Sequence, residues 1–250
     1  DIISLIYIFS CPGNAIRSAQ EMAGRMPEFA DFTFAEKLYM GLANVERIFI
    51  AELDPVYCVV AAVLVLLVYR KTGDYRKTLL AGIPALLLFG QAVVRVSHPS
   101  LKKVFVRPEQ TTHWDWHALV TYMPLVFLVL SVWGILYALW QLADGVWKHY
   151  LWTAFLLAGG FAMGGVMGFS PTIYASANRP YLYLYFVLIY VCADAVWNMG
   201  GMKAVWKTGS SDAVRKMPVP EKLMFTVLGL LVLANILDVT RMCWLLGRIL

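Results

Sequence analysis

The stretch ALVTYMPLVFLVLSVWGILYALWQ at residues 118–141 decides the fold class, because it contains no Asp, Glu, Lys or Arg. At about 1.5 Å per residue, a helix of this length reaches roughly 36 Å. The hydrocarbon core of a bilayer is about 30 Å thick. A continuously apolar run of this length therefore predicts a transmembrane helix.

Five further apolar runs repeat this pattern, at 54–69, 78–94, 150–168, 181–200 and 223–246. The 250-residue chain is 60% hydrophobic and 15% charged, whereas soluble domains carry about 25% charged residues. We predict an all-α polytopic bundle of about six full spans, forming one transmembrane domain over 1–250. Pro84 predicts a second span that is kinked or packed inside the bundle. The short apolar stretch before residue 10 predicts a partial span, and we expect Asp1 to lie within a longer protein.

Basic loops set the expected orientation, since cytoplasmic loops are enriched in Lys and Arg. The loops 70–77 and 201–222 carry four and five such residues and lie an even number of spans apart. We therefore expect 10–53, 95–117 and 169–180 to be extracytoplasmic. Segment 95–117 is itself basic, which indicates either contact with an anionic head group or substrate, or a tolerated exception.

The first outward segment is predicted to be helical. Thr33 and Glu36 have the spacing of a capping box. Phe34, Leu38, Leu42, Val45 and Phe49 then recur at helical spacing. We predict one helix over about 34–52, on the membrane or against the bundle, and a shorter helix over 15–26.

Asn14 and Arg17 follow the turn Pro12-Gly13 on the outward side. Asn14 can cap the next helix, but a cation in a first helical turn opposes the helix dipole. Arg17 therefore predicts a bound phosphate or an acidic neighbour, and Glu21 at i+4 is the alternative partner.

A second outward turn offers hydroxyl, amide and guanidinium groups from Ser170, Asn178 and Arg179. Guanidinium binds phosphate through two parallel hydrogen bonds. The alternative is a capped helix–helix connection, with Arg179 extending to the interface.

The motif His113-Trp114-Asp115-Trp116-His117 adds titratable groups at the outward end of a span. His113 or Asp115 can serve as a general acid or base. The two Trp also fit an interfacial aromatic belt. Tyr and Trp residues cluster near span ends throughout the chain, and a minority facing outward can stack on sugar rings. We expect no metal, no cofactor and no nucleic-acid partner.

Polar residues inside the spans are expensive in a membrane and usually face the bundle interior. Asp194 and Asn198 lie in one span, and Asn235, Asp238 and Arg241 lie in another. They predict a structural polar cluster, or alternatively a transport relay.

The motifs Pro12-Gly13-Asn14…Arg17 and Ser170-Pro171-Thr172…Tyr174…Asn178-Arg179 resemble those of bacterial polytopic membrane proteins related to O-antigen-type glucosyltransferases of the GT-C superfamily. The resemblance covers about 1–180. It implies sugar transfer from a polyprenyl-phosphate donor to a cell-envelope glycan outside the cytoplasm. It also implies donor or acceptor roles for Asn14, Arg17, Ser170, Asn178 and Arg179. It assigns no catalytic base. In GT-C enzymes the catalytic Asp or Glu usually lies in the first outward loop after the first span, and we expect this chain to begin after that loop.

Our leading hypothesis is an envelope glycosyltransferase-like protein of the bacterial inner membrane. Asn14, Arg17, Arg107, Asn178 and Arg179 would hold the anionic lipid-linked sugar. Candidates for proton chemistry are Glu21, His113 and Asp115. One alternative is a transporter or flippase that uses Asp194, Asp238 and Arg241. Another is a non-catalytic subunit of a membrane complex.

Overall fold

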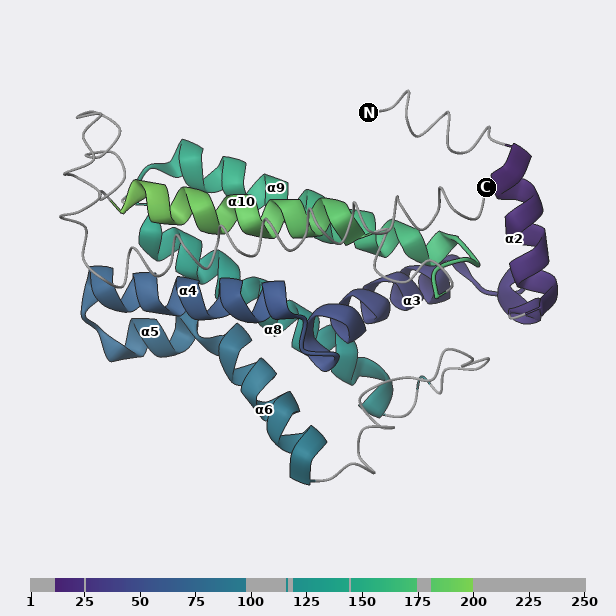
Figure 1. The fold of residues 1–250 in the computed structure, drawn as a ribbon, viewed down its shortest axis with the longest axis horizontal. Coiled ribbons are helices and arrows are strands. Elements are labelled where there is room, and N and C mark those ends of the chain that lie inside the picture. Colours follow the sequence, from purple (N-terminus) through teal and green to yellow (C-terminus); the bar gives the residue numbers. More distant parts are fainter. Residues whose placement is uncertain are drawn as a thin grey trace, which may run out of the picture. The chain divides into compact units, whose positions relative to one another are not determined.

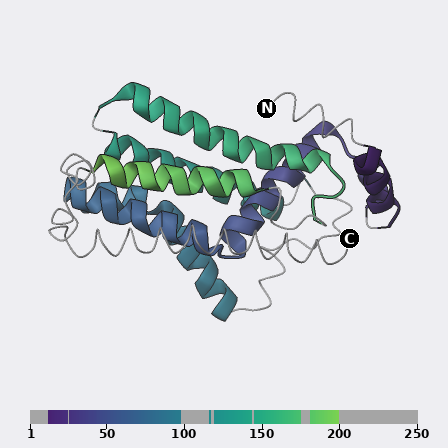
Figure 2. The same cartoon turned by 45° about the horizontal axis from the view of Figure 1, so that its top comes forward.

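The computed structural model describes residues 12–24, 26–97, 116, 119–143, 145–174 and 181–199. These residues form helices and turns, and none of them lies in a strand, as the sequence predicts. Figure 1 labels the α-helices in chain order, and Figure 2 shows the same ribbon from a second direction.

Within the described residues, three helices are long and apolar enough to cross a membrane. They are α4 (Pro55–Thr72), α8 (Leu119–Leu142) and α9 (Trp147–Val166), which continues into the 3₁₀ turn η4 (Met167–Phe169). They correspond to the predicted spans 54–69, 118–141 and 150–168. Arg70 and Lys71 occupy the last turn of α4, where cations interact favourably with the helix dipole. Lys71 also donates from Nζ to the carbonyl of Leu142 at 2.9 Å, which satisfies an unpaired group at the end of α8.

The predicted kink in the second span is confirmed. Helix α5 (Tyr75–Ala81) and helix α6 (Ile83–Ser97) meet at an angle of 63°. Pro84 has no backbone N–H to continue the hydrogen-bonding pattern of α5. The bent pair counts as a fourth candidate span if its two halves are taken together. Figure 1 shows α5 alongside α4.

Helix α10 (Leu182–Asn198) is apolar and 17 residues long, and corresponds to the predicted run 181–200. The predicted run 223–246 and the apolar stretch before residue 10 lie outside the described residues. By its internal contacts the chain divides into two compact units. Unit 1 comprises Asp1–Asp54, Leu86–Trp133 and Leu156–Leu184, and unit 2 comprises Pro55–Ala85, Gly134–Phe155 and Tyr185–Leu250.

Unit 1 contains both helices predicted for the first outward segment. Helix α2 (Pro12–Gly24) starts at Pro12, earlier than expected, because proline is well suited to a first helical position. The 3₁₀ turn η1 (Pro27–Ala30) follows, and then α3 (Phe34–Glu46). The Thr33 side chain accepts from the Glu36 backbone N–H, and the Glu36 carboxylate accepts from the Thr33 N–H at 2.8 Å. The predicted capping box is thus confirmed.

Helix α3 packs on its neighbours through large apolar side chains and through glycine. Phe29, Tyr39, Met40 and Ile173 form a buried cluster that joins η1, α3 and the turn after η4. A Cβ atom on Gly168 would lie 1.9 Å from the Lys37 carbonyl oxygen. This close approach explains why α3 crosses the end of α9 directly at η4, as both ribbon views show (Figures 1 and 2).

Candidate functional site

The structure describes only part of the residues that the sequence singles out. Asn14, Arg17 and Glu21 lie on α2, and the Arg17 side chain is exposed. Ser170 follows η4 and is partly buried. The other candidate positions lie outside the described residues: Arg107, His113, Asp115, Asn178, Arg179, Asp238 and Arg241.

Ser170 organises the first half of the predicted outward turn. Its hydroxyl lies 2.8 Å from the Thr172 hydroxyl, and its carbonyl accepts from the Ile173 N–H at 3.2 Å. Such local bonds are characteristic of Ser and Thr in turns. They direct Ile173 into the core of unit 1, where it is fully buried, and leave Tyr174 partly exposed beside it.

Tyr174 contacts a guanidinium that the sequence did not single out. The Arg47 guanidinium carbon lies 5.6 Å from the centre of the Tyr174 ring, within the range of a cation–π interaction. Arg47 donates from Nε to the Asn44 side-chain oxygen at 2.9 Å, and one of its terminal nitrogens lies 3.2 Å from the Glu52 carboxylate. Arg47 is 15% exposed and Glu52 is 41% exposed. The ion pair therefore reaches solvent through Glu52.

Asn44 links this guanidinium to the residue that precedes α10. Its amide nitrogen donates to the Tyr181 hydroxyl in a short hydrogen bond. The Tyr181 ring packs edge-on against Phe49 at 6.2 Å, and Tyr181 is almost completely buried. We call Asn44, Arg47, Glu52, Tyr174 and Tyr181 the Arg47 cluster. All five residues belong to unit 1.

An unusual stretch of backbone holds Arg47 in place. The chain changes at Arg47 from the α-helix of α3 into a π-helical turn, η2 (Arg47–Ala51), and the Glu52 N–H donates to the Arg47 carbonyl at 2.8 Å. Single π turns are rare overall, but those that occur are often found at functional sites. Leu53 follows with φ 59°, a left-handed conformation that costs a bulky residue roughly 1–2 kcal/mol. The π turn and the left-handed Leu53 together give the end of α3 an unusual backbone conformation.

Glu46 immediately precedes Arg47 and is 1% exposed. Burial raises the pKa of Glu46 to about 8, because removing a carboxylate from water disfavours its charged form. At neutral pH the group is therefore mainly a neutral acid.

The Arg47 cluster has the groups needed to bind a phosphate ester. A guanidinium provides several donors in one plane, and carboxylate or phosphate oxygens can occupy them. Glu52, partly in solvent, is an anion that faces Arg47 within the described residues. The Tyr174 ring adds an apolar face next to the charge, and such faces contact sugar rings.

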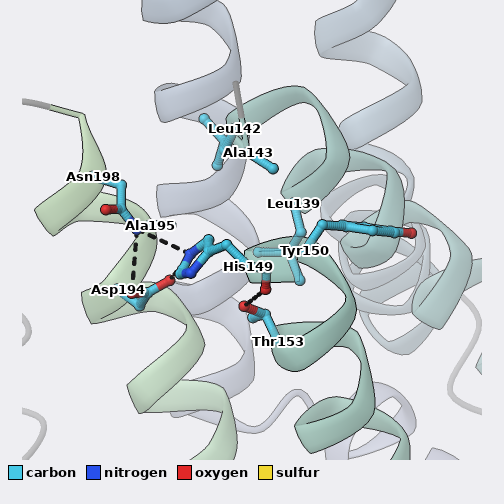
Figure 3. A pocket seen from close by; sticks show the side chains of 9 residues that line it. All are labelled: Leu139, Leu142, Ala143, His149, Tyr150, Thr153, Asp194, Ala195 and Asn198. Atoms are coloured by element: carbon cyan, nitrogen blue, oxygen red, sulfur yellow. Dashed lines mark hydrogen bonds and ion pairs between the residues drawn. The ribbon is translucent and has the colours of Figure 1, made fainter. Parts of the chain in front are cut away.

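A second polar cluster occurs in unit 2, around Asp194, which lies within the predicted span 181–200 (Figure 3). His149 Nε2 lies 2.7 Å from one Asp194 carboxylate oxygen, and the Asn198 amide nitrogen lies 3.2 Å from the other. His149 Nε2 also lies 3.0 Å from the Asn198 amide nitrogen, so the three side chains form one polar network. The Thr153 hydroxyl donates to the His149 carbonyl at 2.9 Å.

The cavity beside this cluster is small. It leaves about 10 Å³ for the centre of a water molecule, which is roughly the space that one water needs. A sugar or a phosphate ester does not fit there. Asp194 already accepts from two donors, and such a satisfied network stabilises helix packing. This geometry favours the structural interpretation of Asp194 and Asn198 over an open ion site.

Sequence reasoning missed His149, Arg47 and Tyr181 as site residues. A signal for His149 was present: Asp194 and Asn198 share a helix face at i and i+4, so the face needed a polar partner from another helix. Arg47 had no such signal, because its aromatic partner Tyr174 lies far along the chain. Tyr181 was indistinguishable in the sequence from the interfacial Tyr and Trp residues.

Among the described residues, no group of three or more His, Cys, Asp or Glu side chains is arranged to hold a metal ion. No protein-family model, no curated protein and no solved structure matches the chain.

Proposed function

We propose that this chain binds a polyprenyl-phosphate-linked sugar at the extracytoplasmic face of the bacterial inner membrane and takes part in its transfer to a cell-envelope glycan. In this proposal the bundle has six full spans, and segments 10–53, 95–117 and 169–180 face outward. The Arg47 cluster receives the phosphate.

One observation carries the proposal: Arg47 meets Tyr174 and, through Asn44, Tyr181. Arg47 and Asn44 come from one of the segments expected outside the cytoplasm, and Tyr174 comes from another. A cation, an amide and two aromatic rings thus converge from distant parts of the sequence. Arginine and aromatic side chains are suited to an anionic ester that also carries a sugar.

The donor phosphate would replace Glu52 opposite the Arg47 guanidinium. An ion pair with an exposed carboxylate contributes only about 0–1 kcal/mol, so the exchange costs little. In the transfer, an acceptor hydroxyl attacks the anomeric carbon, and the bond from that carbon to the phosphate oxygen breaks. Positive charge at Arg47 stabilises the phosphate as it leaves with the electron pair. The hydroxyl proton passes to a general base, for which Glu21, His113 and Asp115 remain candidates.

The transporter alternative relies on Asp194, Asp238 and Arg241. The two donors at Asp194 and the one-water cavity supply no path for a solute in the described residues. We therefore favour the enzyme-like function. Loss of ion-coupled uptake in Asp194→Asn would reverse this preference.

The test measures the extent of envelope glycan modification in cells in which this modification requires the protein. Arg47→Gln and Arg17→Ala should abolish modification while membrane insertion and protein level stay unchanged. Arg76→Gln is the matched control, because Arg76 is an exposed cation in unit 2 whose Nε lies 3.4 Å from the Tyr75 hydroxyl. Undiminished modification in Arg47→Gln would refute the assignment of the phosphate to this cluster.

A further inference from the structure

Asn44 carries a buried amide whose orientation is fixed by its two partners. It is 2% exposed and lies on α3, three residues before Arg47, so the two side chains lie on the same side of the helix. The Arg47 Nε–H can only donate, so the Asn44 atom 2.9 Å away is the amide oxygen. The amide nitrogen therefore points the other way and donates to the Tyr181 hydroxyl. The two contacts together fix both halves of the amide.

Tyr181 is a rigid anchor for the amide nitrogen. Its ring is 1% exposed and packs edge-on against the ring of Phe49. On its other contact, a Cβ atom on Gly164 would lie 3.4 Å from Cε1 of the Tyr181 ring. The ring thus passes close to the backbone of α9, within unit 1. Side chains packed this tightly keep one position, so Asn44 is held between a fixed hydroxyl and Arg47.

The bond to Asn44 decides which edge of the Arg47 guanidinium can meet a ligand. A guanidinium can bind phosphate through Nε and one terminal nitrogen, or through its two terminal nitrogens. The Nε edge is turned towards the buried amide of Asn44. One terminal nitrogen faces Glu52, which is partly exposed to solvent. An anion from solvent therefore reaches the terminal nitrogens on the Glu52 side and not the Nε edge.

We propose that Asn44 is a positioning residue of the Arg47 cluster: it holds Nε of Arg47 so that the two terminal nitrogens face the phosphate ester. This inference rests on the proposed function. It adds that the guanidinium is oriented before the ligand arrives, by an amide that does not touch the ligand. Without the amide, Arg47 is ordered only on binding, and immobilising a long side chain weakens affinity by about 2- to 10-fold.

The experiment is a double-mutant cycle of Asn44→Ala and Arg47→Gln. It measures the affinity of the purified full chain in detergent for a polyprenyl-phosphate-linked monosaccharide at pH 7. Asn44→Ala should weaken binding by about 2- to 10-fold when Arg47 is present. It should have no further effect in Arg47→Gln, because residues that act through a shared partner are not additive.

Asn198→Ala is the matched control for a loss of stability. The Asn198 amide also makes two polar contacts, with His149 and Asp194, but it lies in unit 2. Its removal should lower the melting temperature, as removal of the Asn44 amide does, and should leave the affinity for the monosaccharide probe unchanged. The comparison separates a positioning effect from general destabilisation.

Tyr181→Phe is the second variant, which keeps the test decisive if Asn44→Ala does not fold. It retains the packed ring and removes only the hydroxyl that accepts from the Asn44 amide nitrogen. The amide then loses one of its two anchors. Tyr181→Phe should weaken binding in the same direction as Asn44→Ala, and again only when Arg47 is present.

Native affinity in Asn44→Ala and Tyr181→Phe would overturn the role of Asn44 and leave the proposed function standing. Equal losses of affinity with and without Arg47 would do the same, as would an equal loss in Asn198→Ala. An absence of binding by the native chain at pH 7 would instead overturn the proposed function, and this inference with it.

Discussion

Gly168 approaches Gly41 so closely that a Cβ atom on Gly168 would lie 2.6 Å from the Gly41 backbone nitrogen. The same atom would lie 1.9 Å from the Lys37 carbonyl oxygen. Both contacts are with backbone, which a small side-chain movement cannot relieve. The contact between α3 and η4 therefore depends on glycine at this position, and this contact holds Arg47 near Tyr174.

Gly168→Ala should lower the free energy of unfolding by about 1–3 kcal/mol or more, as overpacking does, and should weaken phosphate-ester binding. Gly159→Ala is the control in α9, because nothing lies within 4 Å of a Cβ atom there. Alanine is favoured over glycine in helices, so this variant should be as stable as the native chain or slightly more. Thermal unfolding in detergent compares the two. Equal stability of both variants would contradict the close packing of α3 on η4.

The stability of the protein should decrease as the pH rises towards 8. The ordinary pKa of a Glu side chain is 4.5, and burial raises the pKa of Glu46 to about 8 in the folded state. Between these values the folded state binds more protons than the unfolded state. Stability then falls with pH, by up to about 5 kcal/mol over this range. It is highest below the unfolded pKa and changes little above the folded pKa.

Glu46→Gln should remove this decrease, because the amide does not ionise. Melting temperatures of the native chain and the variant from pH 5 to pH 9 test the prediction. An identical pH dependence in both proteins would contradict it.

The sequence predicts much of the fold, because membrane spans depend on local composition. Length and apolarity identify α4, α8 and α9, and Pro84 predicts the bend between α5 and α6. The Thr33–Glu36 capping box predicts where α3 begins. The π turn at Arg47 was not predictable, since Arg47–Ala51 carries no sequence signal for it. Within this turn the Phe49 ring packs edge-on against Tyr181, a long-range contact that the local sequence does not specify.

The candidate site was predicted only at the level of segments. The turn at 169–180, predicted to face outward, and the helix predicted at 34–52 were both singled out, and the structure brings Tyr174 of the first against Arg47 of the second. The contact itself depends on Arg47 and Asn44, which the sequence presents as ordinary polar positions of an amphipathic helix. Pairing between segments so far apart in the chain cannot be inferred from helical spacing in one sequence. The roles of Asn14, Arg17 and Ser170 in binding stay predictions.

His149 and Asp194 should be energetically coupled. Removal of either partner leaves the other polar group poorly satisfied, so each single substitution should cost about 1–3 kcal/mol of stability. His149→Ala combined with Asp194→Ala should cost less than the sum of the two, with a coupling of about 0.5–3 kcal/mol. A double-mutant cycle by thermal unfolding measures this difference. Strict additivity would argue against the hydrogen bond between them.

Glu52→Gln should strengthen phosphate-ester binding. Glu52 competes with the incoming anion for Arg47, and an exposed ion pair contributes up to about 1 kcal/mol. Its removal should therefore increase affinity by up to about fivefold. The measurement is a binding titration at pH 7 with the native chain as reference. Weaker binding by Glu52→Gln would indicate that Glu52 positions Arg47 and does not compete with the ligand.

The most direct test of the Arg47 cluster as an anion site is the affinity of Arg47→Gln for the polyprenyl-phosphate-linked monosaccharide at pH 7, with Arg76→Gln as control. Charge-assisted hydrogen bonds contribute about 1.5–3 kcal/mol, so Arg47→Gln should bind about 10- to 100-fold more weakly than the native chain. Arg76→Gln should bind like the native chain. Native affinity in Arg47→Gln would contradict the claim that the Arg47 cluster binds the phosphate.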